Sequence, residues 1–381
     1  MIKLIIKIMQ KVNKTTVSKI IRGFLKFLAI VASFLAIFVI IIPSFLSIVK
    51  GRDIPPVDDS KLQLQTINIP DEENAFYDLS YDLDKVQNLI DTKNLPKDKQ
   101  LVSDYLESDE WSQEVVQQLL ADNEGILQDF SSAAAKGKFQ LPYTDDPSKI
   151  SRDIPVTPLS VYREIGRLSG VKAIWLAKNG QDKEALDEAF KAIIIGNAIE
   201  NSQGLLITHL VGIYIKDSGL DVLQKVISII PEDSLALLEY QSKLENYKAK
   251  GNSAPFAIEY LVWKQSWDNF GQYGIPELKF GVKILIKNKF YFKKNLTTSY
   301  YFDFFNKLAI ESKKDCSEVK EVEESVIQSE EGNLIKMYFT ENVIGKYFVE
   351  FPGVALNNIL EKKCATENKL NETILIIDSR K

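Results

Sequence analysis

The sequence predicts a mainly α-helical protein: an N-terminal transmembrane helix followed by an α-helical bundle or a short α-solenoid of antiparallel hairpins. Three observations lead to this prediction. Apolar residues recur at helical spacing over most of the chain, and few stretches alternate with the period of two that strands require. Residues 27–49 contain no charged residue. The 381 residues are 45% hydrophobic and include only 18 Gly and 13 Pro, so the chain can bury a large core and is not collagen-like.

The N-terminal residues divide into a basic cytoplasmic tail and an apolar span. Residues 1–26 carry seven positive charges and no acidic residue, and the span covers residues 27–49. As a helix it would be about 34 Å long, enough to cross a hydrocarbon core of about 30 Å. The excess of positive charge before the span places residues 50–381 outside the cytoplasm, so we expect a single-pass protein of the cell membrane whose residues 27–49 contact lipid. The alternative is a cleaved signal peptide, although its apolar core should have only about 7–15 residues.

Beyond the span we expect an extended tether and one helical domain. The tether covers residues 50–70, where a Pro-Pro pair favours extended chain. The α-helical extracytoplasmic domain covers residues 71–381, with a sub-boundary near 137–158, where prolines interrupt the helical pattern. Within the domain, residues 205–216 and 220–229 are expected to form separate helices, and the last dozen residues a short helix or a strand.

Net charge and scarce residue types exclude several classes of function. The chain has a net charge of −5, and residues 1–26 contribute +7, so the remainder is −12, which argues against nucleic acid as a partner. One histidine, His209, cannot build a multi-histidine metal site, and no phosphate-binding glycine loop is present. We therefore expect no metal and no cofactor. His209 lies in an apolar stretch, where a packed or capped histidine is favoured over a member of a catalytic triad.

One cluster of acidic and aromatic residues suggests carbohydrate chemistry. Glu259 and Asp268 lie among Tyr260, Trp263 and Trp267. Two carboxylates about 5–10 Å apart can hydrolyse a glycosidic bond, and aromatic rings can stack on sugars. The favoured interpretation is that the rings belong to the core and the acids face solvent.

The two cysteines, Cys316 and Cys364, are candidates for a disulfide. An extracytoplasmic location permits such a bond, and the loop it closes would add about 4 kcal/mol of stability by chain entropy. Two unrelated thiols are the alternative.

A lysine-rich segment is an exception in the acidic domain. Residues 278–294 contain six lysines and no acid. Candidate contacts with anionic lipid headgroups are Lys283, Lys287, Lys289 and Phe290. The alternative is an amphipathic helix whose lysines reach over the core.

One segment resembles a tetratricopeptide hairpin. Residues 168–195 place small residues where the two helices of such a repeat meet: Gly180, Ala185, Ala189 and Ala192. No second copy follows about 34 residues later, so an ordinary helical hairpin is the alternative.

Short segments over most of the chain resemble, in the same order, a family of bacterial proteins with a membrane anchor, a helical domain and no assigned activity. The segments are IPDEENAFYDL (69–79), DEWSQEVVQQLLADN (109–123), KFQLPY (138–143), GQDKEALDEAF (180–190), LITHLVGIYI (206–215), KKNLTTSYYFDFF (293–305) and ENVIGKYF (341–348). The resemblance implies the anchor and the helices, and it implies no site residue.

Together, these features favour a single-pass membrane-anchored helical protein that serves as a protein-interaction or envelope scaffold module for another protein. The alternative is an extracytoplasmic enzyme that depends on carboxylates, such as a glycan hydrolase. We favour the binding module because no motif demands catalysis and no catalytic residue can be assigned.

Overall fold

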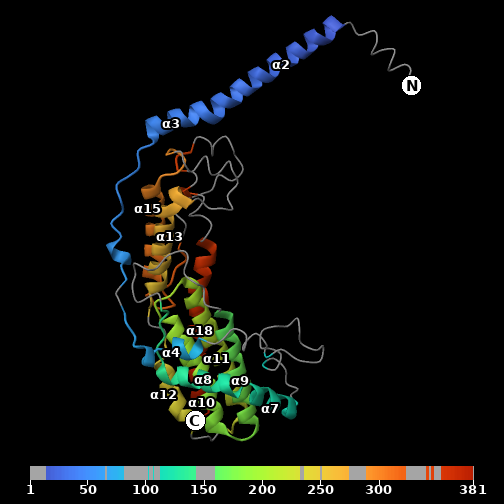
Figure 1. Cartoon of the computed structure of the whole chain (residues 1–381). Helices are drawn as coiled ribbons and strands as arrows, with labels where there is room; N and C mark the ends of the chain where they lie inside the picture. Colours follow the sequence, from blue (N-terminus) through green and yellow to red (C-terminus); the bar gives the residue numbers. More distant parts are fainter. Residues whose placement is uncertain are drawn as a thin grey trace, which may run out of the picture. The chain divides into compact units, whose positions relative to one another are not determined.

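The computed structural model describes residues 14–64, 67–80, 102, 106, 112–142, 159–231, 236–248, 251–273, 289–322, 340–342, 345–346 and 353–380. Across these residues the chain forms helices and no β-strand, so the predicted mainly α-helical class is confirmed (Figure 1). The chain divides into two compact units. Unit 1 consists of Met1–Pro56, Gly271–Thr297 and Ile327–Phe348, and unit 2 consists of Val57–Phe270, Thr298–Val326 and Val349–Lys381.

In unit 1, the apolar N-terminal stretch is helical but divided. Helix α2 (Lys14–Ala36) leads into a π-helix, Ile37–Ile41, and then into α3 (Ile42–Lys50). Pro43 lies at the start of α3, and it accounts for the division because proline has no backbone N–H to donate to the preceding turn. The expectation of one helix over residues 27–49 is corrected accordingly. In the described part of the chain, no individual helix is both long enough and apolar enough to cross a bilayer.

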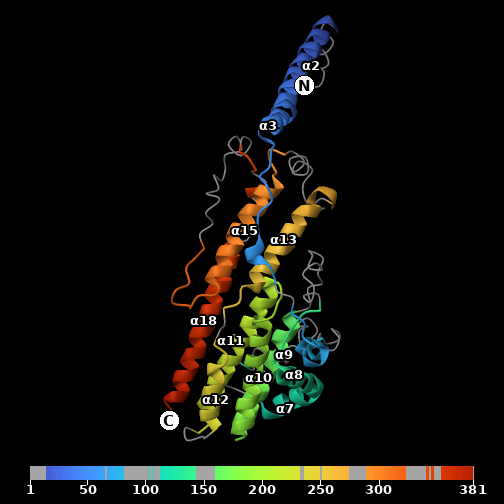
Figure 2. The same cartoon turned by 90° about the vertical axis from the view of Figure 1, so that its left-hand side faces the viewer.

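The core of unit 2 is built on three successive helices, α9 (Leu159–Lys178), α10 (Asp182–Glu200) and α11 (Leu206–Ile229). Helices α12 (Ala236–Glu245) and α18 (Gly353–Asp378) pack beside them, and Figure 2 shows this row of helices. All five contribute buried side chains to one cluster, among them Ala173, Ile193, Leu223, Tyr240 and Leu370. The burial of these apolar surfaces is the main force that holds the helices together.

Helices α9 and α10 form the hairpin expected over residues 168–195. Gly180 ends the turn after α9 with φ of 73°, a conformation that glycine adopts without strain. The N–H of Gln181 donates to the carbonyl of Leu176 at 3.0 Å, which closes the turn. The small residues Ala185 and Ala189 are buried, so the two helices can approach closely.

Helices α10 and α11 approach each other most closely at two glycines. A Cβ atom on Gly212 would lie 2.8 Å from Cα of Glu200 and from the carbonyl oxygen of Gly196. A Cβ atom on Gly196 would likewise lie 2.8 Å from Cα of Lys216. Ordinary contact begins near 3.4 Å, so any larger residue at either position would push the two helix backbones apart.

Helix α11 runs without a break through residues that were expected to separate two helices. The Asp-Ser-Gly sequence at 217–219 has the composition of a helix end. However, Gly219 serves close packing, because a Cβ atom there would lie 3.0 Å from the backbone nitrogen of Ile193 on α10. The expectation of separate helices over 205–216 and 220–229 is therefore wrong.

Helix α18 contains the C-terminal residues that were expected as a short helix or a strand. It is joined to α11 by ion pairs on Asp217, to which Lys362 and Lys369 donate at 2.6 and 2.8 Å. Both lysines hold the pKa of Asp217 below its usual value, although burial of the carboxyl group acts in the opposite direction.

Two further helix groups complete unit 2. Helices α4 (Ala75–Leu79), α7 (Gln113–Asp122) and α8 (Glu124–Lys136) pack against one another or against α9 and α10. Helices α13 (Ala254–Tyr273) and α15 (Lys294–Glu311) belong mostly to unit 2, although the last residues of α13 and the first turn of α15 fall in unit 1. Aromatic rings of unit 2 join the two helices, with the ring centroids of Trp263 and Tyr301 at 5.6 Å. Residues 143–158, most of the expected sub-boundary, lie outside the described residues.

Part of the expected tether lies along unit 2. It contains one 3₁₀ turn, Ser60–Leu62, and a second one, Asp71–Glu73, follows directly after the tether. Leu62 is buried, and Asp59 accepts a hydrogen bond from the hydroxyl of Tyr260 at 2.9 Å. The segment is thus held by specific contacts.

Candidate functional site

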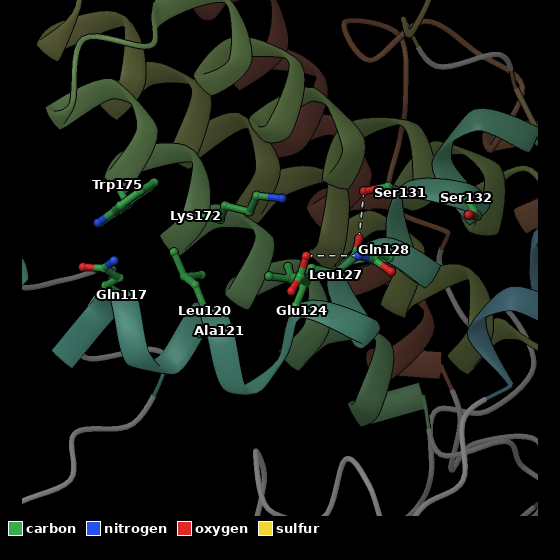
Figure 3. Close-up of a pocket in the computed structure, with 10 residues that line it drawn as sticks. All are labelled: Gln117, Leu120, Ala121, Glu124, Leu127, Gln128, Ser131, Ser132, Lys172 and Trp175. Atoms are coloured by element: carbon green, nitrogen blue, oxygen red, sulfur yellow. Dashed lines mark hydrogen bonds between the residues drawn. The ribbon is translucent and has the colours of Figure 1, made fainter. Parts of the chain in front are cut away.

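A groove of about 640 Å³ lies between α7, α8 and α9 in unit 2 (Figure 3). Its volume is in the range of ordinary ligand pockets. Apolar side chains form part of the lining, and polar side chains reach it from all three helices: Gln117 from α7, Glu124 and Gln128 from α8, and Lys172 from α9. Trp175 of α9 lies at one end, with its indole nitrogen on the side of Gln117.

Local sequence explains why α7 and α8 form here. Ser112 caps α7, because its hydroxyl accepts from the N–H of Val115 at 3.4 Å. Asn123 separates the two helices, and its side chain donates to the carbonyl of Leu119 at 2.8 Å. Gly137 ends α8 with φ of 62°. The apolar faces then pack on α9 through a small buried cluster that includes Val116, Leu127, Leu168 and Val171.

Behind the groove, one buried carboxylate forms ion pairs with two lysines. Glu188 of α10 is 3% exposed and accepts from Lys172 at 3.2 Å, from Lys191 at 2.7 Å and from the hydroxyl of Ser169 at 2.8 Å. Lys191 also donates to the hydroxyl of Ser131 at 2.8 Å. A carboxylate so enclosed is stabilised by its partners.

The groove can therefore offer hydrogen bonds without a strong charge. The positive charges of Lys172 and Lys191 are balanced by two carboxylates. One is Glu188 behind the groove, and the other is Glu124 in its lining. Gln128 donates to Glu124 at 3.1 Å, which leaves its carbonyl oxygen and the second carboxylate oxygen as acceptors. The indole N–H of Trp175 has no acceptor among the described residues. Such a lining suits a neutral ligand rich in amide or hydroxyl groups, and the Trp175 ring supplies apolar area.

The expected pair of carboxylates is only partly described. Glu259 of α13 is partly buried, and burial raises the pKa of its carboxyl group, while hydrogen bonds from the Leu206 backbone and the Trp263 side chain oppose the rise. Trp263, whose side chain donates to Glu259, stacks on Trp267 with the ring centroids at 5.8 Å. The side chain of Asp268 lies outside the described part of the structure, so the expected pair stays a prediction.

His209 is a packed histidine, as the favoured interpretation held. It is 3% exposed, and its Nδ1 lies 2.6 Å from the carbonyl oxygen of Glu200. A carbonyl oxygen only accepts, so Nδ1 carries the proton and donates. Burial lowers the pKa of His209.

Beside His209, Lys216 and Glu200 form an ion pair of 3.1 Å whose side chains are 1% and 4% exposed. Lys363, also buried, donates to the carbonyl of Ser312 at 2.8 Å.

The sulfur atoms of Cys316 and Cys364 lie at bonding distance, and their Cα atoms are 5.3 Å apart. The bond would join the residues after α15 to α18, next to the contact between Lys363 and Ser312. It would thus fix the end of one helix to the side of another.

The structure divides the expected membrane contacts. Lys289 is exposed, whereas Phe290 is 1% exposed, so the expectation that its ring faces lipid is corrected. Neighbouring rings cover it, and the centroid of Tyr291 lies 5.1 Å away. Lys283 and Lys287 lie outside the described residues.

Sequence reasoning missed the groove. It named neither Trp175 nor any polar residue of the lining as a candidate site residue. One signal was present: α7 and α8 carry several amide and acidic side chains on the face next to their apolar stripe, including Gln117 and Gln128. That pattern also fits a solvated helix face, so only the docking of α7 and α8 on α9 identifies the site.

Comparison of the chain with known protein families, with curated proteins and with solved structures finds no match in any of the three. The resemblance to a family of membrane-anchored helical proteins therefore stays a prediction that rests on the short segments alone.

Proposed function

We propose that the protein is a membrane-anchored helical module that binds a partner protein in the groove between α7, α8 and α9. The observation that carries the proposal is the groove itself, with its apolar floor, its hydrogen-bonding rim and its balanced charge. Grooves between packed helices commonly receive an extended or helical segment of a partner.

The proposed anchor is residues 27–49, with the N-terminus in the cytoplasm and unit 2 outside it. The support is that helical segments follow one another from Lys14 to Lys50 and that their apolar side chains are exposed: Phe34 is 65%, Phe45 62% and Ile48 83% exposed. Such a surface needs lipid or protein around it. A bond between the two cysteines would also agree with an oxidising compartment.

The groove favours binding over catalysis. Glycoside hydrolysis needs a second carboxylate beside the first, and Glu124 is the one acid among the described residues that line the groove. Glu188 lies behind it and is held by Lys172 and Lys191. The alternative of a carboxylate-dependent enzyme keeps one supporting observation, the raised pKa of Glu259.

Photo-crosslinking of the full-length protein in its native membrane tests the proposal. A photoreactive amino acid at Gln117 or at Gln128 should give the same adduct, and the same amino acid at Glu372, an exposed position on α18, should give none. Ala121→Arg, which places a long side chain in the groove at an exposed helix position, should abolish the adduct. Adducts that survive Ala121→Arg, or that form equally from Glu372, would overturn the proposal.

A further inference from the structure

In unit 2, the segment that follows α15 is held against α18 at its start, its middle and its end. At the start, Lys363 donates to the carbonyl of Ser312 at 2.8 Å. At the end, the side chain of Asn357 accepts from the N–H of Val322 and donates to its carbonyl, both at 3.1 Å. The middle contact is the pair of cysteines, whose Cα atoms are 5.3 Å apart. The segment is thus attached to one helix at intervals of a few residues.

The middle of the segment, residues 313–321, has little buried surface. The structure describes all of these residues, and none of them is buried. The N–H of Glu318 donates to the carbonyl of Asp315 at 2.8 Å, and the N–H of Lys320 donates to the carboxylate of Glu311, at the end of α15, at 3.0 Å. These bonds stay within the segment or return to α15. Burial of apolar surface therefore contributes little to the attachment of residues 313–321 to α18, and the cysteine pair provides most of it.

A carboxylate lies against the cysteine pair. Sγ of Cys316 is 2.9 Å from Oε2 of Glu367, which follows Cys364 by three residues on α18. A sulfur atom in a disulfide has no hydrogen to donate, whereas a thiol can donate to a carboxylate. Glu367 therefore gains a hydrogen bond only when the two cysteines are reduced, and it lowers the free energy of the reduced pair relative to the bonded pair. Both cysteines are partly exposed, so a small thiol can reach them.

We propose that Cys316 and Cys364 form a reducible latch: a disulfide that Glu367 makes easier to reduce, and whose reduction frees residues 313–321 from α18. A glutathione thiolate attacks one sulfur atom, so that a mixed disulfide forms while the bond between Cys316 and Cys364 breaks. A second glutathione thiolate attacks the mixed disulfide and releases the cysteine. Two electrons and two protons pass to the two cysteines, and two glutathione thiols become one glutathione disulfide. The latch depends neither on the proposed groove nor on the proposed anchor.

Redox titration of the full-length protein tests the role of Glu367. The protein in neutral detergent is equilibrated with glutathione and glutathione disulfide at a series of ratios, free thiols are trapped with a maleimide, and the reduced fraction is read by mass spectrometry. Glu367→Ala should lower the equilibrium constant for reduction by about tenfold, because the hydrogen bond from the thiol to a charged acceptor is lost. Glu367→Gln keeps an acceptor without the charge and should lie between Glu367→Ala and the wild type. The matched control is Glu361→Ala, which removes an exposed acid of α18 and should leave the constant unchanged.

Hydrogen exchange followed by mass spectrometry tests the release of the segment. In the wild type, reduction should make the amides of residues 313–321 exchange at least about tenfold faster, while those in the middle of α18 keep their rate. Cys316→Ser/Cys364→Ser should exchange at the reduced rate with or without a reductant.

Several results would overturn the latch. Two free thiols in the untreated protein would show that no bond forms. A reduction constant for Glu367→Ala equal to that of the wild type, or an equal fall in Glu361→Ala, would remove the role of Glu367. Equal exchange of residues 313–321 before and after reduction would show that other contacts hold the segment. Loss of the helical circular dichroism signal on reduction would show that the bond holds the whole fold and is not a local latch.

Discussion

The close crossing of α10 and α11 allows the effect of a larger residue at Gly212 on stability to be predicted. Gly212→Ala introduces a Cβ atom 2.8 Å from Cα of Glu200 and from the carbonyl oxygen of Gly196, and closer still to the backbone nitrogen of Glu200. All of these atoms belong to backbone, so no side chain can rotate away. The shortest of these distances is 2.3 Å, so restoring ordinary contact near 3.4 Å requires the two backbones to separate by about 1 Å.

The cost of that separation exceeds the gain in helix propensity. Alanine is favoured over glycine in a helix interior by about 1 kcal/mol. Overpacking of a close contact typically costs about 1–3 kcal/mol and sometimes more, and a small gap along the crossing also forfeits dispersion between the buried side chains of α10 and α11. We expect a net destabilisation of about 2 kcal/mol. For unfolding of a chain of this size, that corresponds to a fall of about 2–3 °C in Tm.

Thermal unfolding of the full-length protein in detergent, followed by circular dichroism at the helical minimum, measures the effect. The control is Gly125→Ala on α8, where a Cβ atom would meet nothing within 4 Å, so the same substitution should stabilise by up to about 1 kcal/mol. The two variants should therefore shift Tm in opposite directions. A Gly212→Ala protein that melts at or above the wild-type temperature would refute the close crossing.

Three further predictions concern the buried polar groups and the cysteines. Lys216→Met leaves Glu200 buried without the cation of its ion pair, and the free energy of unfolding measured in urea should fall by about 3–5 kcal/mol. A second change in the same protein, Glu200→Leu, should restore most of that free energy. Burial lowers the pKa of His209, so below about pH 6.5 the unfolded chain binds more protons than the folded chain, and the free energy of unfolding should fall towards about pH 5. Unfolding curves of His209→Asn should lack this fall between about pH 6.5 and about pH 5. A pH dependence equal to that of the wild type would contradict the prediction. A bond between Cys316 and Cys364 should make two thiols alkylatable only after reduction, with a loss of about 4 kcal/mol, and two alkylatable thiols in the untreated protein would exclude the bond.

The features that the sequence predicted well are those that depend on neighbouring residues. Helical spacing of apolar residues predicted the α-helical class, and the small residues over 168–195, Gly180 among them, predicted the hairpin of α9 and α10. Both signals act within a few residues, so no knowledge of the rest of the fold is needed. The predicted break in α11 was wrong because Gly219 does not end a helix. It allows α11 to pack closely on α10, and the contacted residues of α10 precede it in the chain by more than 20 residues, beyond the range of a local pattern.

The groove could not be predicted because no local pattern defines it. Trp175 has the spacing of a core residue, and it does pack against two buried clusters, yet one part of its ring lines the groove. Glu188 looks like a solvated acid in the sequence, but it is buried by α9 and neutralised by Lys172 and Lys191. The exposure of such side chains depends on where α7 and α8 dock, and sequence spacing contains no information on that.

Two acidic residues have the same role at helix ends, and this bears on the choice between binding and catalysis. Helix α11 begins after Leu205, which has no capping side chain, and Glu259 from α13 accepts from the N–H of Leu206 at 3.5 Å. The first turn of α15 likewise receives its carboxylate from a distant residue, Asp53. An acid at a helix N-terminus satisfies unpaired N–H groups and interacts favourably with the helix dipole. Glu259 therefore has a structural reason to be a partly buried carboxyl group among aromatic rings, and its raised pKa does not by itself require a catalytic role. That leaves the groove, where apolar side chains and polar side chains from three helices line one hollow, as the better-supported place for function.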